Sequence, residues 1–144
     1  MKYDCLKLEN QLCFPLYLCS KEIIKHYTPH LDKLNLTYTQ YIVMLYLWEH
    51  GKSNVKEIGN TLMLDSSTLT PLLKKLEAKG YITRKRDVSD ERIVNVSLTR
   101  KGQKLKEDAV EIPKKMGYCI NLNEKEVMSL YSLTYKILAN IEKE

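Results

Sequence analysis

Apolar residues recur every three or four positions along most of this chain, a spacing typical of amphipathic helices. The first such stretch, residues 6–30, predicts a helix that Pro15 could kink near its start. A second helix is predicted to begin at Thr37, because Gln40 follows three residues later as in a capping box, and to end at Gly51. Its buried face is predicted to comprise Tyr41, Met44, Leu45, Leu47 and Trp48.

Two more helices are predicted to follow closely. The first is short, with Asn54 as its cap, Glu57 as the capping-box partner, and Ile58 and Leu62 facing inward. Gly80 is suited to end the second. The inner face of that second helix shows the i, i+3, i+4, i+7 pattern, in Leu69, Leu72, Leu73 and Leu76.

The start of this leucine-bearing helix is ambiguous from the residues alone. Asp65 or Ser66 would make a suitable N-cap. Pro71, however, favours the first helical position, which would place the cap at Thr70 and leave residues 65–70 as an extra turn.

The C-terminal half begins with two predicted strands, residues 81–86 and 92–98, joined by a polar tip at residues 87–91. Thr99 is predicted to cap a long basic helix that Pro113 or Gly117 disturbs. Asn123 and Glu126 form another possible capping box, which opens the last helix. One stripe of that helix is predicted to carry Val127, Leu130, Thr134, Ile137, Leu138 and Ile141.

The predicted order is therefore four helices, a hairpin and two helices, a mainly α fold with a small β-hairpin wing. A helix, a short turn, a second helix and a basic hairpin are typical of a winged helix-turn-helix. We expect one domain over residues 1–144, with the winged helix-turn-helix at about residues 37–100. Residues 1–36 and 101–144 carry more apolar surface than such a unit needs, and we interpret them as dimerisation helices of a homodimer.

Charge is unevenly distributed along the chain. The net charge is +5, yet residues 74–106 contain eleven Lys or Arg and only four Asp or Glu. A local basic block of this kind is typical of a protein that binds a polyanion. The first 30 residues lack a signal-peptide pattern, and no stretch reaches the roughly 20 apolar residues of a membrane span, so we expect a cytoplasmic protein that does not contact the membrane.

Candidate DNA-binding residues fall on the leucine-bearing helix and on the hairpin. Short hydroxyl side chains near a helix N-terminus can approach base edges and phosphates, and lysines further along can contact the backbone. An arginine at a hairpin tip can enter a narrow minor groove, and Asp90 could orient it. A plain helix cap and a surface ion pair of Arg92 with Asp90 or Glu91 are the competing interpretations. The candidates are Ser66, Ser67, Thr68, Thr70, Lys74 and Lys75 on the helix, and Arg84, Lys85, Arg86, Asp90 and Arg92 on the hairpin.

These segments resemble a known family. Residues 64–77 (LDSSTLTPLLKKLE), residues 80–86 (GYITRKR) and residues 90–92 (DER) are similar to the multiple-antibiotic-resistance regulator (MarR) family of transcription regulators. Residues 8–14 (LENQLCF) resemble its branch of organic hydroperoxide resistance regulators (OhrR). The resemblance implies a repressor dimer on a pseudo-palindromic operator in double-stranded DNA. It also implies that the recognition helix begins near Ser66.

The resemblance further implies a thiol switch. Cys13 matches the cysteine that senses organic hydroperoxide or another oxidant, after whose oxidation the operator is released. Tyr27 and Tyr38 match two tyrosines that donate hydrogen bonds to it from the partner subunit, which suits the chemistry, because phenol donors stabilise the reactive thiolate. Cys119 is the candidate that captures the oxidised sensor as a disulfide, since related two-cysteine members pair it with a C-terminal cysteine.

Three other functions remain open from the sequence. The first is a MarR-type repressor gated by a small phenolic or aromatic ligand, without thiol chemistry. The second is a thiol peroxidase, although no catalytic group beyond Cys13 is evident. The third is a metal sensor through His26 and His30, with Pro29 between them. The four cysteines form no CxxC pair, which argues against a structural zinc site. We expect a regulator that is no enzyme and that needs no metal or other cofactor.

Overall fold

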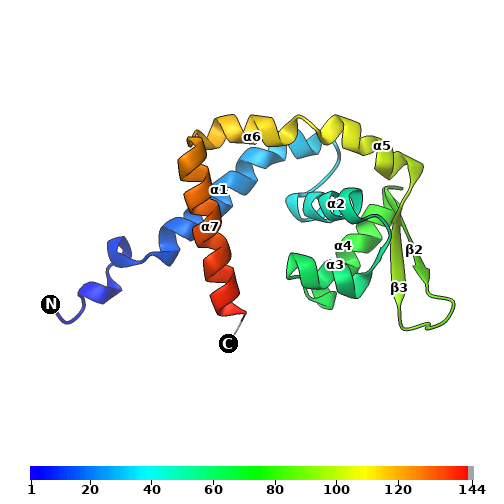
Figure 1. Cartoon of the computed structure of the whole chain (residues 1–144), viewed down its shortest axis with the longest axis horizontal. Helices are drawn as coiled ribbons and strands as arrows, with labels where there is room; N and C mark the ends of the chain where they lie inside the picture. The colour runs from blue at the N-terminus through cyan, green and yellow to red at the C-terminus, as the bar shows by residue number, and fades with distance from the viewer. Residues whose placement is uncertain (143–144) are drawn as a thin grey trace. The chain divides into compact units, whose positions relative to one another are not determined.

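The structure, a computed structural model, describes residues 1–142 and divides into two compact units, Met1–Ile112 and the chain from Pro113 onward (Figure 1). Two 3-10 turns, η1 (Asp4–Leu6) and η2 (Leu8–Asn10), open the first unit. In chain order it then contains α1 (Cys13–Asp32), α2 (Tyr38–His50), β1 (Ser53–Asn54), α3 (Val55–Leu62), α4 (Ser66–Ala78), β2 (Ile82–Arg86), β3 (Val94–Leu98) and α5 (Arg100–Ala109). The boundary falls at the start of α6 (Ile112–Ile120), and α7 (Glu124–Ile141) completes the second unit.

A winged helix-turn-helix forms the centre of the first unit, as predicted. Helices α2, α3 and α4 pack beside an antiparallel sheet of order β1-β3-β2, and the β2–β3 hairpin is its wing (Figure 1). Arg84 in β2 pairs with Val96 in β3, and Val96 pairs in turn with Ser53 in β1. The two-residue strand β1 was not predicted, because a segment so short has no detectable alternation.

The core of this unit confirms most of the predicted inner faces. All four predicted leucines of α4 are buried, as is Ile58 of α3, whereas Leu62 is only half-buried. In α2 the prediction for Leu45 was wrong: its side chain is 41% exposed, and Val43 and Tyr46 are buried instead. Because α2 is apolar on nearly every side, helical spacing could not distinguish its exposed face.

Local capping signals placed most helix ends correctly. The capping boxes Thr37/Gln40, Asn54/Glu57 and Asn123/Glu126 are all formed, and Thr99 caps α5. Gly51 and Gly80 follow α2 and α4 with φ of 72° and 76°, a conformation that side chains with a Cβ disfavour. These ends depend on neighbouring residues only, so the sequence was sufficient to find them.

Helix α1 begins later than predicted. It starts at Cys13, not at residue 6, and the preceding residues form η1 and η2. The Gln11 side chain closes these turns by donating to the carbonyl oxygens of Cys5 and Lys7, at 2.5 and 3.3 Å. Pro15 is the third residue of the observed helix, where its missing N–H is not needed, and a helix starting at residue 6 would have placed it in the interior.

Helix α4 begins at Ser66, as the family resemblance implied, and the alternative start at Pro71 is wrong. Asp65 is the N-cap, and its carboxylate accepts the Thr68 N–H at 2.8 Å. Pro71 lies inside the helix and cannot donate to the Ser67 carbonyl. Both residues are exposed, so water can take that role.

The predicted basic helix after the wing is interrupted before Pro113 rather than at it. The break between Ala109 and Ile112 gives two helices, α5 and α6, so three helices follow the wing instead of two. Pro113 is then the second residue of α6, a position that proline tolerates, and Gly117 lies within that helix. The two wing strands are each one or two residues shorter than predicted.

The loop between α1 and α2 is tied to the segment that follows α4. Gln40 is 3% exposed, and its Oε1 accepts a hydrogen bond from Lys79 Nζ at 2.7 Å. The same ammonium donates to the Asn35 carbonyl at 2.7 Å, and burial lowers the pKa of Lys79. The Tyr81 hydroxyl donates to the Leu34 carbonyl at 2.9 Å. These bonds therefore connect the loop to the segment directly after α4.

Several helices keep apolar side chains exposed. In the described part of the chain, no helix is long and apolar enough to cross a membrane. The exposed apolar residues gather at the start of α1 and along α7, where they include Leu12, Leu16, Tyr17, Val127, Leu130, Ile137, Leu138 and Ile141.

Candidate DNA-binding surface and thiol site

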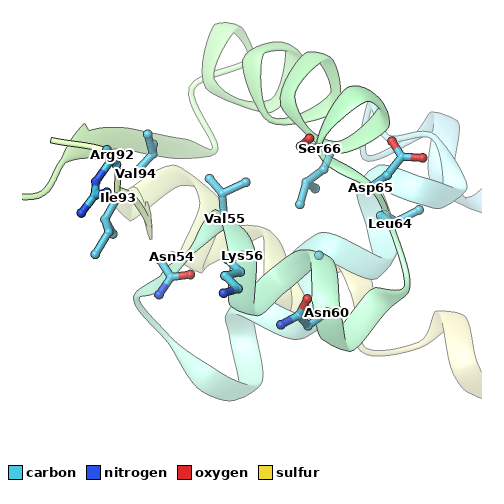
Figure 2. Close-up of a pocket in the computed structure, with 12 residues that line it drawn as sticks. Asn54, Val55, Lys56, Asn60, Leu64, Asp65, Ser66, Arg92, Ile93 and Val94 are labelled. Atoms are coloured by element: carbon cyan, nitrogen blue, oxygen red, sulfur yellow. The ribbon is translucent and has the colours of Figure 1, made fainter. Parts of the chain in front are cut away.

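A groove of about 580 Å³ lies between α3, the start of α4 and residues 92–94 at the tip end of the wing (Figure 2). Ser66 and Arg92, predicted from separate segments, both line it. Its other polar side chains are Asn54, Lys56, Asn60 and Asp65.

The N-terminal turn of α4 is organised around Asp65. Its carboxylate accepts the Ser67 hydroxyl at 2.6 Å as well as the Thr68 N–H. The bond from Ser67 contributes most to lowering the pKa of Asp65, so this carboxylate stays charged. Ser66, Ser67 and Thr68 are all exposed, and this turn can face a ligand.

The other predicted residues of α4 lie further along the helix. Thr70 is half-buried, and Lys74 and Lys75 are exposed. An exposed lysine beyond the first turn can meet a phosphate of a nucleic-acid backbone without reading its bases.

Arg92 is held in a fork by Asp90 beside the wing tip. The Arg92 Nε and Nη2 atoms lie 3.0 and 3.1 Å from the two carboxylate oxygens of Asp90, and the Arg92 N–H donates to the same group at 3.0 Å. The Arg92 side chain is still 90% exposed. Such an exposed pair adds little to stability. It does restrict the directions in which the guanidinium can point.

The remaining cations of the wing differ in how free they are to contact DNA. Arg84 is bound by Glu77 of α4: its Nε and Nη2 lie 3.1 and 2.9 Å from Glu77 Oε2, and its N–H donates to Oε1 at 2.9 Å. Its guanidinium therefore links β2 to α4, which does not favour the predicted DNA contact. Arg86 is exposed and donates to the Glu91 carbonyl at 2.7 Å, and Lys85 is exposed.

Sequence reasoning missed two polar residues of the groove, Lys56 and Asn60. Both belong to α3, outside the basic block of residues 74–106 on which the charge argument rested. A signal was present, because the Asn54/Glu57 capping box fixes the start of α3 and so the face on which Lys56 lies.

Three tyrosines cluster where α1 meets α2. The ring centroids of Tyr27 and Tyr38 are 5.0 Å apart, and Tyr41 lies 5.8 Å from Tyr27 and 6.4 Å from Tyr38. Burial raises the pKa of Tyr27 and of Tyr38, and raises that of Tyr41 to about 12. All three hydroxyls therefore stay protonated at neutral pH and can donate hydrogen bonds.

Cys13, the predicted sensor, is exposed at the first position of α1. Tyr27 lies 14 residues later on the same helix, which corresponds to about 21 Å along its axis. The structure therefore does not bring Tyr27 to Cys13 of its own chain. Cys5, Cys19 and Cys119 are also exposed and unpaired with one another, and Cys119 lies in the second unit.

Metal ligation finds no support in residues 1–142. This part of the chain contains no group of three or more His, Cys, Asp or Glu side chains placed to hold an ion. His26 and His30 alone provide two ligands at most, fewer than a metal site usually has.

The chain is similar to known regulators over nearly its whole length. A family model described as transcriptional regulator SarA/Rot matches residues 25–109. The organic hydroperoxide resistance transcriptional regulator of Bacillus subtilis is 49% identical over 146 residues, which cover 99% of this chain and 97% of that protein.

AbfR of Staphylococcus epidermidis is similar in structure in three states. Reduced AbfR bound to DNA has 35% identity and a TM-score of 0.81, and the match covers 98% of this chain and 99% of that one. Overoxidised AbfR bound to DNA has 38% identity and a TM-score of 0.77, and the match covers 96% of this chain and 99% of that one. AbfR with its disulfide formed has 37% identity and a TM-score of 0.69, and the match covers 96% of this chain and 97% of that one.

These relatives are DNA-binding transcription regulators and not enzymes, which overturns the thiol peroxidase alternative. The similarity spans the tyrosine cluster, the recognition helix and the wing. The chain belongs to the MarR/SarA family of winged-helix transcription regulators, in the branch of the organic hydroperoxide resistance regulators.

Proposed function

We propose that this regulator is a homodimeric repressor that releases its operator when an organic hydroperoxide or a related oxidant oxidises Cys13. The observation that carries the proposal is the arrangement of Cys13 and the tyrosine cluster. Cys13 is exposed at one end of α1, and Tyr27 and Tyr38 meet near the other end. Their separation requires a second chain if the phenols are to reach the thiol.

The exposed apolar residues of α1 and α7 support a homodimer. A soluble monomer rarely leaves so many large apolar side chains in water, and a second copy would bury them. A twofold dimer would present two α4 helices and two wings to the two half-sites of a pseudo-palindrome. In each half-site, Ser66 and Lys56 would approach the DNA from the groove and Arg92 from the wing.

The phenols suit the chemistry of the sensor. Within residues 1–142 of one chain, neither the Tyr27 nor the Tyr38 hydroxyl has a hydrogen-bond partner, and both are protonated at neutral pH. Two such donors from a partner subunit would stabilise the Cys13 thiolate without adding a competing cation. The thiolate attacks the terminal peroxide oxygen and the O–O bond breaks, so that the OH group is transferred to sulfur and Cys13 becomes a sulfenic acid. The alkoxide leaves and takes a proton from water to become the alcohol.

A disulfide is the proposed form that releases DNA. The Cys119 thiol of the partner subunit attacks the sulfenic sulfur, an S–S bond forms and water leaves. AbfR is bound to DNA in both its reduced and its overoxidised structures, and AbfR also forms a disulfide. These states support a mechanism in which oxidation of the sensor sulfur alone is not sufficient, and the cross-link moves the two recognition helices apart.

The experiment compares operator affinity before and after treatment with cumene hydroperoxide, using fluorescence anisotropy. The duplex is the pseudo-palindrome selected by the protein from random sequences. We expect the wild type to lose affinity on oxidation and to regain it with dithiothreitol, and Cys13→Ser to bind equally well throughout. Release of the Cys13→Ser variant by salicylate, with no response of the wild type to peroxide, would instead establish a repressor gated by a phenolic ligand.

Removal of the tyrosine hydroxyls is expected to slow the sensor. In Tyr27→Phe and Tyr38→Phe, one phenol is lost with little change in volume, so less Cys13 is thiolate at neutral pH and alkylation by iodoacetamide is slower. Alkylation rates measured from pH 5 to pH 10 on the Cys5→Ser, Cys19→Ser, Cys119→Ser background report Cys13 alone. Affinity of the reduced protein for DNA should not change, and unaltered rate profiles in both variants would remove the tyrosines from the mechanism.

A further inference from the structure

The tip of the wing is exposed, and its hydrogen bonds define its shape. Val88 is fully exposed, and this loop projects from the end of the β2–β3 hairpin (Figure 1). An exposed loop depends largely on its own hydrogen bonds for a fixed shape. In this wing, four of those bonds end on one carboxylate, that of Asp87.

Asp87 accepts four hydrogen bonds within the hairpin. Its Oδ1 accepts the Ser89 N–H at 2.9 Å, the Ser89 hydroxyl at 2.6 Å and the Asp90 N–H at 3.3 Å. Its Oδ2 accepts the side-chain amide of Asn95 in β3 at 2.9 Å. These bonds, with that from Ser89 contributing most, hold the pKa of Asp87 far below its ordinary value. Asp87 therefore closes the loop against β3 and remains an anion.

The network continues from Asp87 to Arg92. Asp87 fixes the backbone of Asp90, and the Asp90 carboxylate holds the Arg92 guanidinium at two points. The far side of the loop is closed by the Asp87 N–H, which donates to the Ile93 carbonyl at 2.8 Å. Arg92 reaches the groove of Figure 2 from this loop, so the position of its side chain depends on the shape that Asp87 sets.

We propose that Asp87 is a positioning residue for DNA binding, which fixes the wing tip so that Arg92 enters the minor groove without reordering of the loop. The proposal rests on the proposed function, in which Arg92 contacts DNA. Preorganised loops bind more tightly because less conformational entropy is lost on association. Asp87 itself does not touch the DNA.

The proposal predicts that DNA affinity changes in the opposite direction from the one that electrostatics predicts. Asp87 is an anion beside a polyanion, so electrostatics alone predicts tighter DNA binding when its charge is removed. Positioning predicts the opposite for alanine, which cannot accept the hydrogen bonds. Asparagine separates the two effects, because it loses the charge but keeps an acceptor oxygen for the Ser89 and Asp90 N–H groups, while the Asn95 amide can rotate to accept from it.

The experiment measures operator affinity of reduced Asp87→Ala, Asp87→Asn and Glu91→Ala. Glu91 is the matched control: it carries the same charge in the same loop, and its carboxylate makes no hydrogen bond or ion pair within residues 1–142. We expect Asp87→Ala to bind about fivefold more weakly than the wild type, and Asp87→Asn and Glu91→Ala to bind as tightly or more tightly. The thermal midpoint of Asp87→Ala should fall only modestly, since the lost hydrogen bonds lie in an exposed loop outside the core.

A double-mutant cycle with Arg92→Ala tests whether Asp87 acts through the arginine. In that background, Asp87→Ala should cause no further loss of affinity. Tighter binding by Asp87→Ala, or an undiminished loss without Arg92, would overturn the positioning role and leave the proposed function in place. An Arg92→Ala variant with wild-type affinity would overturn both the proposed wing contact and the role of Asp87.

Discussion

Serine in place of Cys119 is expected to abolish the covalent dimer that hydroperoxide forms in the wild-type protein. The proposed disulfide joins Cys13 of one subunit to Cys119 of the other, so a non-reducing gel should show a dimer band after oxidation only when both thiols are present. In Cys119→Ser, the sulfenic acid has no resolving thiol and stays on Cys13 or combines with a small thiol. Intact mass should then show one added oxygen or the small-thiol adduct.

The other two cysteines provide matched controls. Cys19 lies six residues after Cys13 on α1, about 9 Å along the axis, which is too far for a disulfide within one chain. Cys5 lies on the segment of 3-10 turns before the helix. We expect Cys5→Ser and Cys19→Ser to retain the dimer band and the peroxide response.

Operator release should follow the disulfide. Oxidised Cys119→Ser is expected to keep most of its DNA affinity, because an oxygen on Cys13 does not by itself move the two recognition helices apart. A dimer band that persists without Cys119 would assign the resolving thiol elsewhere. Full release by the oxidised variant would show that sulfenic acid is the signal and that the cross-link is secondary.

Features set by neighbouring residues were predictable from the sequence, and features set by tertiary contacts were not. Capping boxes such as Asn54/Glu57 and the leucine stripe of α4 are local, and both were found. The pairing of Arg84 with Glu77 joins residues seven apart on different elements, and nothing in the charge pattern distinguished Arg84 from the exposed Lys85. The basic block therefore indicated a candidate DNA-binding region but could not rank its cations.

The same distinction applies to α1 and to the groove. The apolar pattern that includes Leu12 and Leu16 begins before α1, so periodicity alone placed the start of the helix too early. Proline is tolerated best in the first turn of a helix, and Pro15 therefore fits the observed start at Cys13. Lys56 became a candidate only when α3, α4 and the wing were seen to enclose one groove. The thiol site was reached through the resemblance of residues 8–14, because an exposed cysteine has no pattern of its own.

Alanine in place of Arg92 is expected to weaken operator binding by about 1–3 kcal/mol, roughly 5- to 150-fold. The guanidinium is 90% exposed and already oriented by Asp90, so it can enter the minor groove at little cost in side-chain order. Its loss should matter most at operators with a narrow, A·T-rich minor groove under the wing, and relax preference there.

Lys74→Ala provides the comparison that distinguishes a contact in the minor groove from a contact with the phosphate backbone. This exposed lysine on α4 is expected to contact a phosphate, so its removal should weaken binding to all sequences alike and reduce the salt slope of the logarithm of affinity by about one. Arg92→Ala should instead change the ranking of operators. Anisotropy titrations at several salt concentrations, on A·T-rich and G·C-rich flanks, measure both effects. If Arg92→Ala lowered affinity equally on both flanks, Arg92 would be a backbone contact like Lys74, and the wing would position the protein on DNA without reading its sequence.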